Sequence, residues 1–95
     1  MVVDLDRHQA SKGGDELKLT PREFRLLGYL LEHRGEVVSR EQLLDAVWGY
    51  QFEGYQHTVN SHINRLRAKI EENPAQPRYI LTVWGVGYKF AEFDE

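Results

Sequence analysis

The residues best suited to chemistry lie between positions 57 and 72, where basic and hydrogen-bonding side chains recur around a predicted helix. At about 100° per residue, an apolar seam that must be buried falls on one side: Val59, Ile63, Leu66 and Ile70. The other faces hold no acid before Glu71. Asn and Arg side chains there can reach base edges, while hydroxyl and basic groups can contact phosphates. The pattern is typical of a helix that enters a DNA groove, but this helix alone is equally compatible with a solvated face that happens to lack acids.

The distribution of charge supports the first interpretation. The 95 residues carry 12 Lys and Arg against 15 Asp and Glu, for a net charge of -3. Residues 57–90 nevertheless hold five bases and two acids, a net +3, whereas residues 1–56 and the last acidic residues each contribute −3. A basic third helix and hairpin on an acidic chain indicate a localised anion-binding surface.

A predicted C-terminal hairpin adds polar and aromatic groups beside this helix. Thr82 and Trp84 point to one side of the first strand, and Tyr88 begins the return strand. A hydroxyl and a ring at a hairpin tip suit contacts with a sugar–phosphate backbone or a minor groove. The alternative is that Trp84 and Tyr88 cover the small core, and composition alone favours this alternative for Trp84.

The elements that must position these groups follow from capping and periodicity. Weak alternation predicts strands at 2–6 and 17–19, and two Thr/Ser capping boxes open helices predicted at 21–34 and 40–48. The third helix is predicted at 58–72, and the hairpin has strands at 79–84 and 88–93 around a tight turn at 85–87. The expected fold class is α+β, with a small sheet, three helices and a hairpin in one domain over residues 1–95.

Several classes of protein are excluded by composition and spacing. The hydrophobic fraction of 41% argues against disorder, the absence of cysteine excludes disulfides, and no apolar run is long enough to span a membrane. His57 and His62 have the wrong spacing for two metal ligands on one helix face. We expect no enzyme, no metal and no cofactor. The serious rival is a module used only for protein contacts, favoured by the acidic pI near 5.8 and the aromatic residues of loop 50–56.

Four blocks of sequence in collinear order resemble one family. They are residues 19–24 (LTPREF), 39–49 (SREQLLDAVWG), 58–70 (TVNSHINRLRAKI) and 82–88 (TVWGVGY). Together they resemble the winged-helix (winged helix-turn-helix) DNA-binding effector domain of OmpR/PhoB-type bacterial two-component response regulators, over essentially the whole chain.

The resemblance implies a fold and a function. It implies a four-stranded N-terminal antiparallel sheet, a three-helix bundle and a C-terminal β-hairpin wing. The chain would bind double-stranded DNA sequence-specifically and regulate transcription, with helix 58–72 in the major groove and wing 79–93 at the minor groove.

The resemblance also implies site residues. The base contacts would be Ser61 and Arg65. The backbone or wing contacts by resemblance would be Trp48, His57, Thr58, His62, Asn64, Arg67, Thr82 and Tyr88. The chemistry of the helix and hairpin adds Asn60, Lys69 and Trp84. RNA polymerase would face the loop Tyr50, Gln51, Phe52, Glu53, Gly54 and Tyr55.

Departures from the family pattern qualify this picture. Many members have an arginine that enters the minor groove at the position of Trp84, so we expect the indole to pack along a sugar instead. The receiver domain of such regulators is absent, which suggests an excised fragment, and a sensor histidine kinase would act only through that domain. We expect a cytoplasmic protein that is monomeric alone and forms dimers on tandem direct repeats of DNA.

Overall fold

The computed structural model describes residues 1–49 and 56–92, and opens with a small antiparallel sheet. Its strands are β1 (Val2–Asp4), β2 (Gln9–Lys12) and β3 (Asp15–Glu16), in the order β1-β2-β3. The strand predicted at 2–6 is confirmed in shortened form, but the strand predicted at 17–19 is wrong. After Glu16 the ladder with β2 ends in a single bond from Leu17 N to Ala10 O (2.8 Å), and the chain leaves toward the first helix. Within the described residues this sheet has three strands rather than the four that the resemblance implied.

Helix α1 (Pro21–Glu32) confirms the first predicted helix and its capping box. Thr20 Oγ1 accepts from the Glu23 backbone N–H at 3.1 Å, and Glu23 Oε1 accepts from the Thr20 N–H at 2.9 Å. The helix ends two residues earlier than predicted, at Glu32, because the chain tightens into a turn before Gly35, whose φ is 85°.

The second predicted helix is divided in two. A capping box at Ser39 starts α2 (Arg40–Leu43), which continues as the π-helical segment η1 (Leu44–Trp48) up to Gly49. The predicted bounds are confirmed, whereas the change to π-helical hydrogen bonding has no signal in the apolar spacing, which is compatible with either kind of helix.

Helix α3 (Gln56–Ile70) carries the seam predicted from the sequence. Val59, Ile63, Leu66 and Ile70 are all fully buried. The helix ends before the predicted Glu72 because Glu71 turns inward. The carboxylate of Glu71 accepts backbone N–H groups of residues 78, 79 and 80 at 2.8–3.1 Å, which ties the segment after α3 to the start of the hairpin.

A second antiparallel sheet contains the hairpin. Strands β4 (Val37–Ser39), β5 (Ile80–Val83) and β6 (Gly87–Phe90) have the order β4-β6-β5. The hairpin is confirmed, but its strands are shorter than predicted, its turn lies at 84–86, and Phe93 lies outside the described residues. A Cβ at Gly87 would lie 2.1 Å from Val38 O, so a glycine is needed where β6 pairs closely with β4.

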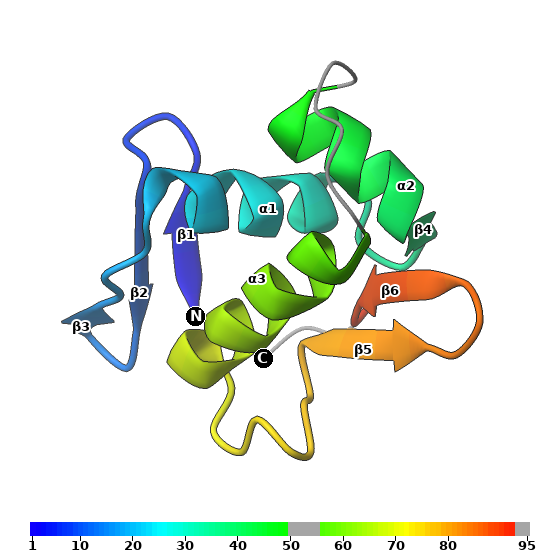
Figure 1. Cartoon of the computed structure of the whole chain (residues 1–95). Helices are drawn as coiled ribbons and strands as arrows, with labels where there is room; N and C mark the ends of the chain where they lie inside the picture. The colour runs from blue at the N-terminus through cyan, green and yellow to red at the C-terminus, as the bar shows by residue number, and fades with distance from the viewer. Residues whose placement is uncertain (50–55, 93–95) are drawn as a thin grey trace.

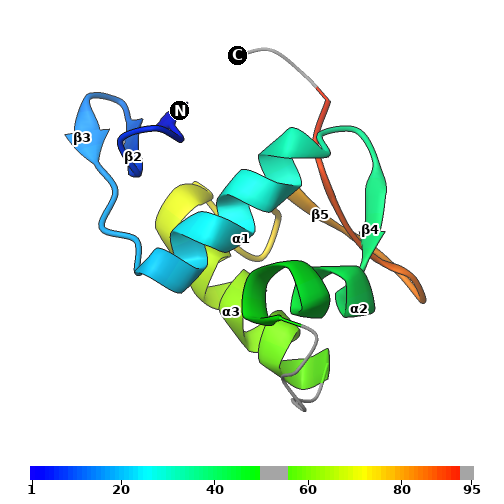
Figure 2. The ribbon, with the colours of Figure 1, turned by 90° about the horizontal axis from the view of Figure 1, so that it is seen from above.

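The helices lie between the two sheets, with the N-terminal sheet on one side and the wing sheet on the other (Figure 1, Figure 2). The core joins the buried faces of α1, α2, η1 and α3 to β4, β5 and β6. No helix in the described ranges is long and apolar enough to cross a membrane.

Candidate nucleic-acid interface

The outer face of α3 is exposed, as the helical periodicity predicts. The exposed residues on this helix are His57, Ser61, Asn64, Arg65, Ala68 and Lys69. Ser61 and Arg65, the predicted base contacts, are four residues apart and therefore lie on one face of the helix. Small side chains at Ser61 and Ala68 allow a close approach of another molecule to the helix backbone.

One flank of α3 packs against α1 and η1 through an aromatic cluster. The indole of Trp48 makes an edge contact with the His62 imidazole, with ring centroids 4.9 Å apart. The Arg22 guanidinium lies 5.2 Å from the centroid of the same indole. His62 Nδ1 also lies 2.9 Å from the backbone oxygen of Thr58. Thr58 and His62 share this flank, as the helical periodicity predicts, and the fold adds Trp48 and Arg22 to it, whereas their predicted contacts with DNA stay predictions.

Farther along the same flank, Lys69 forms an ion pair with Glu23 of α1. The Glu23 side chain is 4% exposed and that of Lys69 is 35% exposed. Burial raises the pKa of the Glu23 carboxyl, but hydrogen bonds from Lys69 and Thr20 outweigh burial, so the pKa lies below its ordinary value of 4.5. Lys69, predicted as a phosphate contact, thus already has an internal partner.

The opposite flank faces the wing and is organised around Asn60. The Asn60 Oδ1 atom accepts hydrogen bonds from Arg40 Nε at 2.8 Å and from the Tyr88 hydroxyl at 2.7 Å. The predicted backbone contacts Asn60 and Tyr88 therefore meet each other inside the protein.

Arg67 continues this flank and holds the first strand of the wing. Its guanidinium donates to Ile80 O at 2.7 and 3.1 Å and to Thr82 Oγ1 at 2.8 Å. Burial lowers the pKa of Arg67, and the negative charge of the Glu71 carboxylate partly offsets that effect. At 9% exposure, Arg67 has a structural role that requires no DNA, whereas its predicted contact to the sugar–phosphate backbone stays a prediction.

The two rings of the wing have opposite environments. Trp84 is 87% exposed at the tip of the hairpin, so the alternative that it covers the core is wrong. Tyr88 is 4% exposed and belongs to the core, so for this residue the same alternative is confirmed. The reason is register, because Tyr88 pairs with Thr82 and Val38 inside the sheet, whereas Trp84 lies in the turn.

Three functional or structural roles were missed in the sequence. Arg22 and Arg40 lie outside α3 and reach it only through tertiary contacts, so no local spacing indicated them. Glu71 entered the sequence analysis only through its charge, whereas in the structure its buried carboxylate accepts backbone N–H groups at the start of the hairpin. The predicted polymerase-facing loop, residues 50–55, lies outside the described residues.

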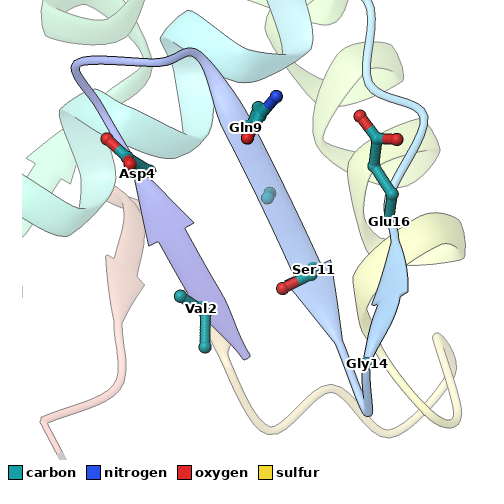
Figure 3. A pocket seen from close by; sticks show the side chains of 7 residues that line it. Val2, Asp4, Gln9, Ser11, Gly14 and Glu16 are labelled. Atoms are coloured by element: carbon teal, nitrogen blue, oxygen red, sulfur yellow. The ribbon is translucent and has the colours of Figure 1, made fainter.

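Two further features were considered as alternative sites among the described residues, a metal site and a surface depression. Within the described ranges, no group of His, Cys, Asp or Glu residues is arranged to hold a metal ion. A depression on the N-terminal sheet is lined by residues of β1, β2 and β3 and the adjoining turn (Figure 3). Its charged lining residues are Asp4 and Glu16, so it is unsuited to a polyanion.

Comparison with known proteins places this geometry in context. The family model for the C-terminal domain of transcriptional regulatory proteins matches residues 14–90. The regulatory protein VanRc of Enterococcus gallinarum is 48% identical over 88 residues, which are 93% of this chain and 38% of that protein. The chain thus spans less than half the length of this curated relative.

Solved structures show the same arrangement of elements. The response regulator DrrB of Thermotoga maritima, described as an OmpR/PhoB homologue, has a TM-score of 0.88 at 38% identity, covering 95% of this chain and 41% of that one. The Klebsiella pneumoniae RstA DNA-binding domain, solved in complex with the RstA box, has a TM-score of 0.85 at 34% identity, covering 94% and 88%.

Proposed function

Because the chain belongs to the family of C-terminal domains of transcriptional regulatory proteins, of OmpR/PhoB type, we propose that it is the DNA-binding output domain of a response regulator. In this role it binds double-stranded DNA sequence-specifically and regulates transcription, and it is not an enzyme. The solved complex of the RstA domain with its box supports this function by similarity.

One observation of this molecule carries the proposal. The outer face of α3 is exposed and contains no acid, and one flank of the same helix is bonded to the strands of the wing, whose tip is exposed. A helix of this kind fits the major groove, while the wing reaches the adjacent minor groove. Ser61 and Arg65 would contact base edges, with Arg65 suited to two hydrogen bonds with a guanine.

The remaining site residues divide into two groups. The exposed or half-buried groups would contact the sugar–phosphate backbone: Trp48, His57, Thr58, His62, Asn64, Thr82 and Trp84. Asn60, Arg67, Lys69 and Tyr88 have internal partners and would act mainly by positioning the helix and the wing. In this arrangement Trp84 packs along a sugar rather than entering deep into the minor groove.

The proposal extends to partners beyond DNA. A response regulator would place this domain after a receiver domain, and a sensor histidine kinase would act through that domain. RNA polymerase would contact the loop of residues 50–55. The domain would be monomeric alone, would pair on tandem direct repeats and would function in the cytoplasm.

The test is selection of bound duplexes from a random DNA pool at a stated salt concentration. We expect one enriched motif whose half-site repeats about one helical turn apart, because two copies of the domain would bind the same face of the duplex. Recovery of no motif, together with binding to a protein partner, would favour the rival function of a module for protein contacts.

A further inference from the structure

Three separate parts of the chain meet at one oxygen atom on the flank of α3 that faces the wing. Asn60 Oδ1 accepts from Nε of Arg40, the first residue of α2, and from the hydroxyl of Tyr88 in β6. The guanidinium carbons of Arg40 and Arg67 lie 5.2 and 5.4 Å from the centroid of the Tyr88 ring. Two cationic groups therefore share one aromatic ring, which holds their side chains in place.

The guanidinium groups of Arg40 and Arg67 differ in how many of their N–H groups are already bonded within the protein. Arg67 is buried and donates to Ile80 O and Thr82 Oγ1. Arg40 is only half-buried, and its contacts within the described residues use Nε–H and the face of the guanidinium. The N–H groups on the two Nη atoms of Arg40 thus remain for another acceptor.

The charge of Arg40 does not stabilise the element that carries it. Arg40 occupies the first turn of α2, where the helix dipole disfavours a cation. In the part of the chain that the structure describes, no carboxylate forms an ion pair with Arg40. Arg40 is instead bonded to the neutral side-chain amide of Asn60, which holds the guanidinium in place without neutralising its charge.

We infer that Arg40 binds a phosphate of the DNA strand that runs between the major-groove helix and the minor-groove wing, and that Asn60 and Tyr88 are its positioning residues. This inference rests on the proposed function. The sugar–phosphate backbone that separates two adjacent grooves must pass between a helix in one groove and a wing in the other. The cluster of Arg40, Asn60 and Tyr88 joins α3 to the wing and therefore lies along that path. A planar guanidinium presents the paired N–H groups that match phosphate oxygens.

The first experiment measures DNA binding by Arg40→Gln and Arg40→Lys on the selected duplex across a salt series. Arg40→Gln should weaken binding about tenfold, as loss of one charged hydrogen-bonding contact does. It should also reduce the slope of log K against log salt by ~0.9, the value for one phosphate. Arg40→Lys should keep that slope because it keeps the charge. A slope for Arg40→Lys as low as for Arg40→Gln would contradict a role based on charge.

Arg25→Gln is the matched control. Arg25 is an exposed arginine of α1 that donates to Ala46 O at 3.4 Å, so its substitution removes the same charge from the side of the helix bundle formed by α1 and η1. The salt slope should stay at the wild-type value. If Arg40→Gln changes affinity and slope no more than Arg25→Gln does, the inference is wrong, even though DNA binding by the wild-type chain still supports the proposed function. If the wild-type chain binds no duplex, the proposed function itself fails.

Asn60→Asp tests the positioning role separately. The two side chains have nearly the same shape, but the carboxylate would form an ion pair with Arg40. We expect the thermal unfolding midpoint to be unchanged or raised, while the affinity for DNA and the salt slope both fall. Loss of a folding contact alone would lower the midpoint. DNA binding by Asn60→Asp at wild-type affinity and slope would overturn the assignment of Asn60.

Discussion

At the scale of single residues, Arg65 is the side chain on which specificity depends in this account. It is exposed on the outer face of α3, one helical turn from Ser61, and a guanidinium can form two hydrogen bonds with the major-groove edge of a guanine. Arg65 therefore differs from Arg67, whose guanidinium is engaged with the wing.

The substitution Arg65→Ala should cost about 1–3 kcal/mol of binding free energy on the preferred duplex and relax the preference at one base pair. Titration of the variant against duplexes that differ singly at each position measures both effects. Its thermal unfolding should match that of the wild type. An unchanged affinity and base preference would remove Arg65 from the site.

Trp84 provides a second test at this scale. Because its side chain is 87% exposed in the turn at 84–86, Trp84→Ala should change the free energy of unfolding by no more than about 0.5 kcal/mol. Affinity for DNA should nevertheless fall, since the indole would pack on a sugar. Chemical denaturation and DNA titration of the same preparation measure the two effects. A loss of stability with no loss of affinity would show that Trp84 serves only the fold.

At the scale of elements, α3 is held on each flank by polar contacts as well as by its seam. The Glu23–Lys69 pair joins it to α1, and the Asn60–Tyr88 contact joins it to β6. The orientation of the helix relative to α1 and the wing is therefore fixed by groups that bind one another within the protein.

The ion pair between α1 and α3 makes the stability of the domain sensitive to acid. The pKa of Glu23 in the folded state lies below 4.5, so its contribution is present above that pH and is lost as pH falls through the lower folded value. Glu23→Gln should cost about 1–3 kcal/mol at neutral pH, because Lys69 loses its partner. As the pH is lowered, the free energy of unfolding of Glu23→Gln should also change less than that of the wild type. Chemical denaturation at a series of pH values measures this difference.

Glu36→Gln is the control for this experiment, since Glu36 is exposed between α1 and β4. It should leave the acid dependence of stability nearly as in the wild type. If Glu36→Gln flattened that dependence as much as Glu23→Gln does, the account of the Glu23 pKa would be wrong.

Local signals predicted the elements better than they predicted the contacts between elements. The capping residues Thr20 and Ser39 and the seam of α3 are encoded within a few residues, so helix starts and the buried face were predictable. The pairing of β4 with β6 and the bonds of Arg40 and Arg67 join residues far apart in the sequence. Those contacts depend on the assembled fold, and no periodicity carries them.

At the scale of the whole molecule, the net charge of -3 is reconciled with DNA binding by the separation of charge. The surplus of bases lies in α3 and the wing, whereas the N-terminal sheet and first helices have a surplus of acids, and the Lys69–Glu23 pair joins the two parts. This asymmetry favours one orientation of approach but limits the affinity of a single copy. Tight binding should therefore require two copies on adjacent half-sites.

Assembly on DNA can be tested with two duplexes, one that carries a single half-site and one that carries a tandem pair of half-sites. Light scattering should give the mass of a monomer without DNA, and two copies should occupy the tandem duplex with a higher affinity per copy than the single half-site. A stable dimer in the absence of DNA would contradict this expectation.

The most direct test of the central claim is titration of the selected duplex into the wild-type chain at increasing salt. If α3 and the wing contact several phosphates, log K should fall linearly with log salt, by ~0.9 for each phosphate neutralised. A scrambled duplex should bind more weakly at every salt concentration. Equal affinity for both duplexes, or binding that does not depend on salt, would contradict a sequence-specific DNA-binding domain.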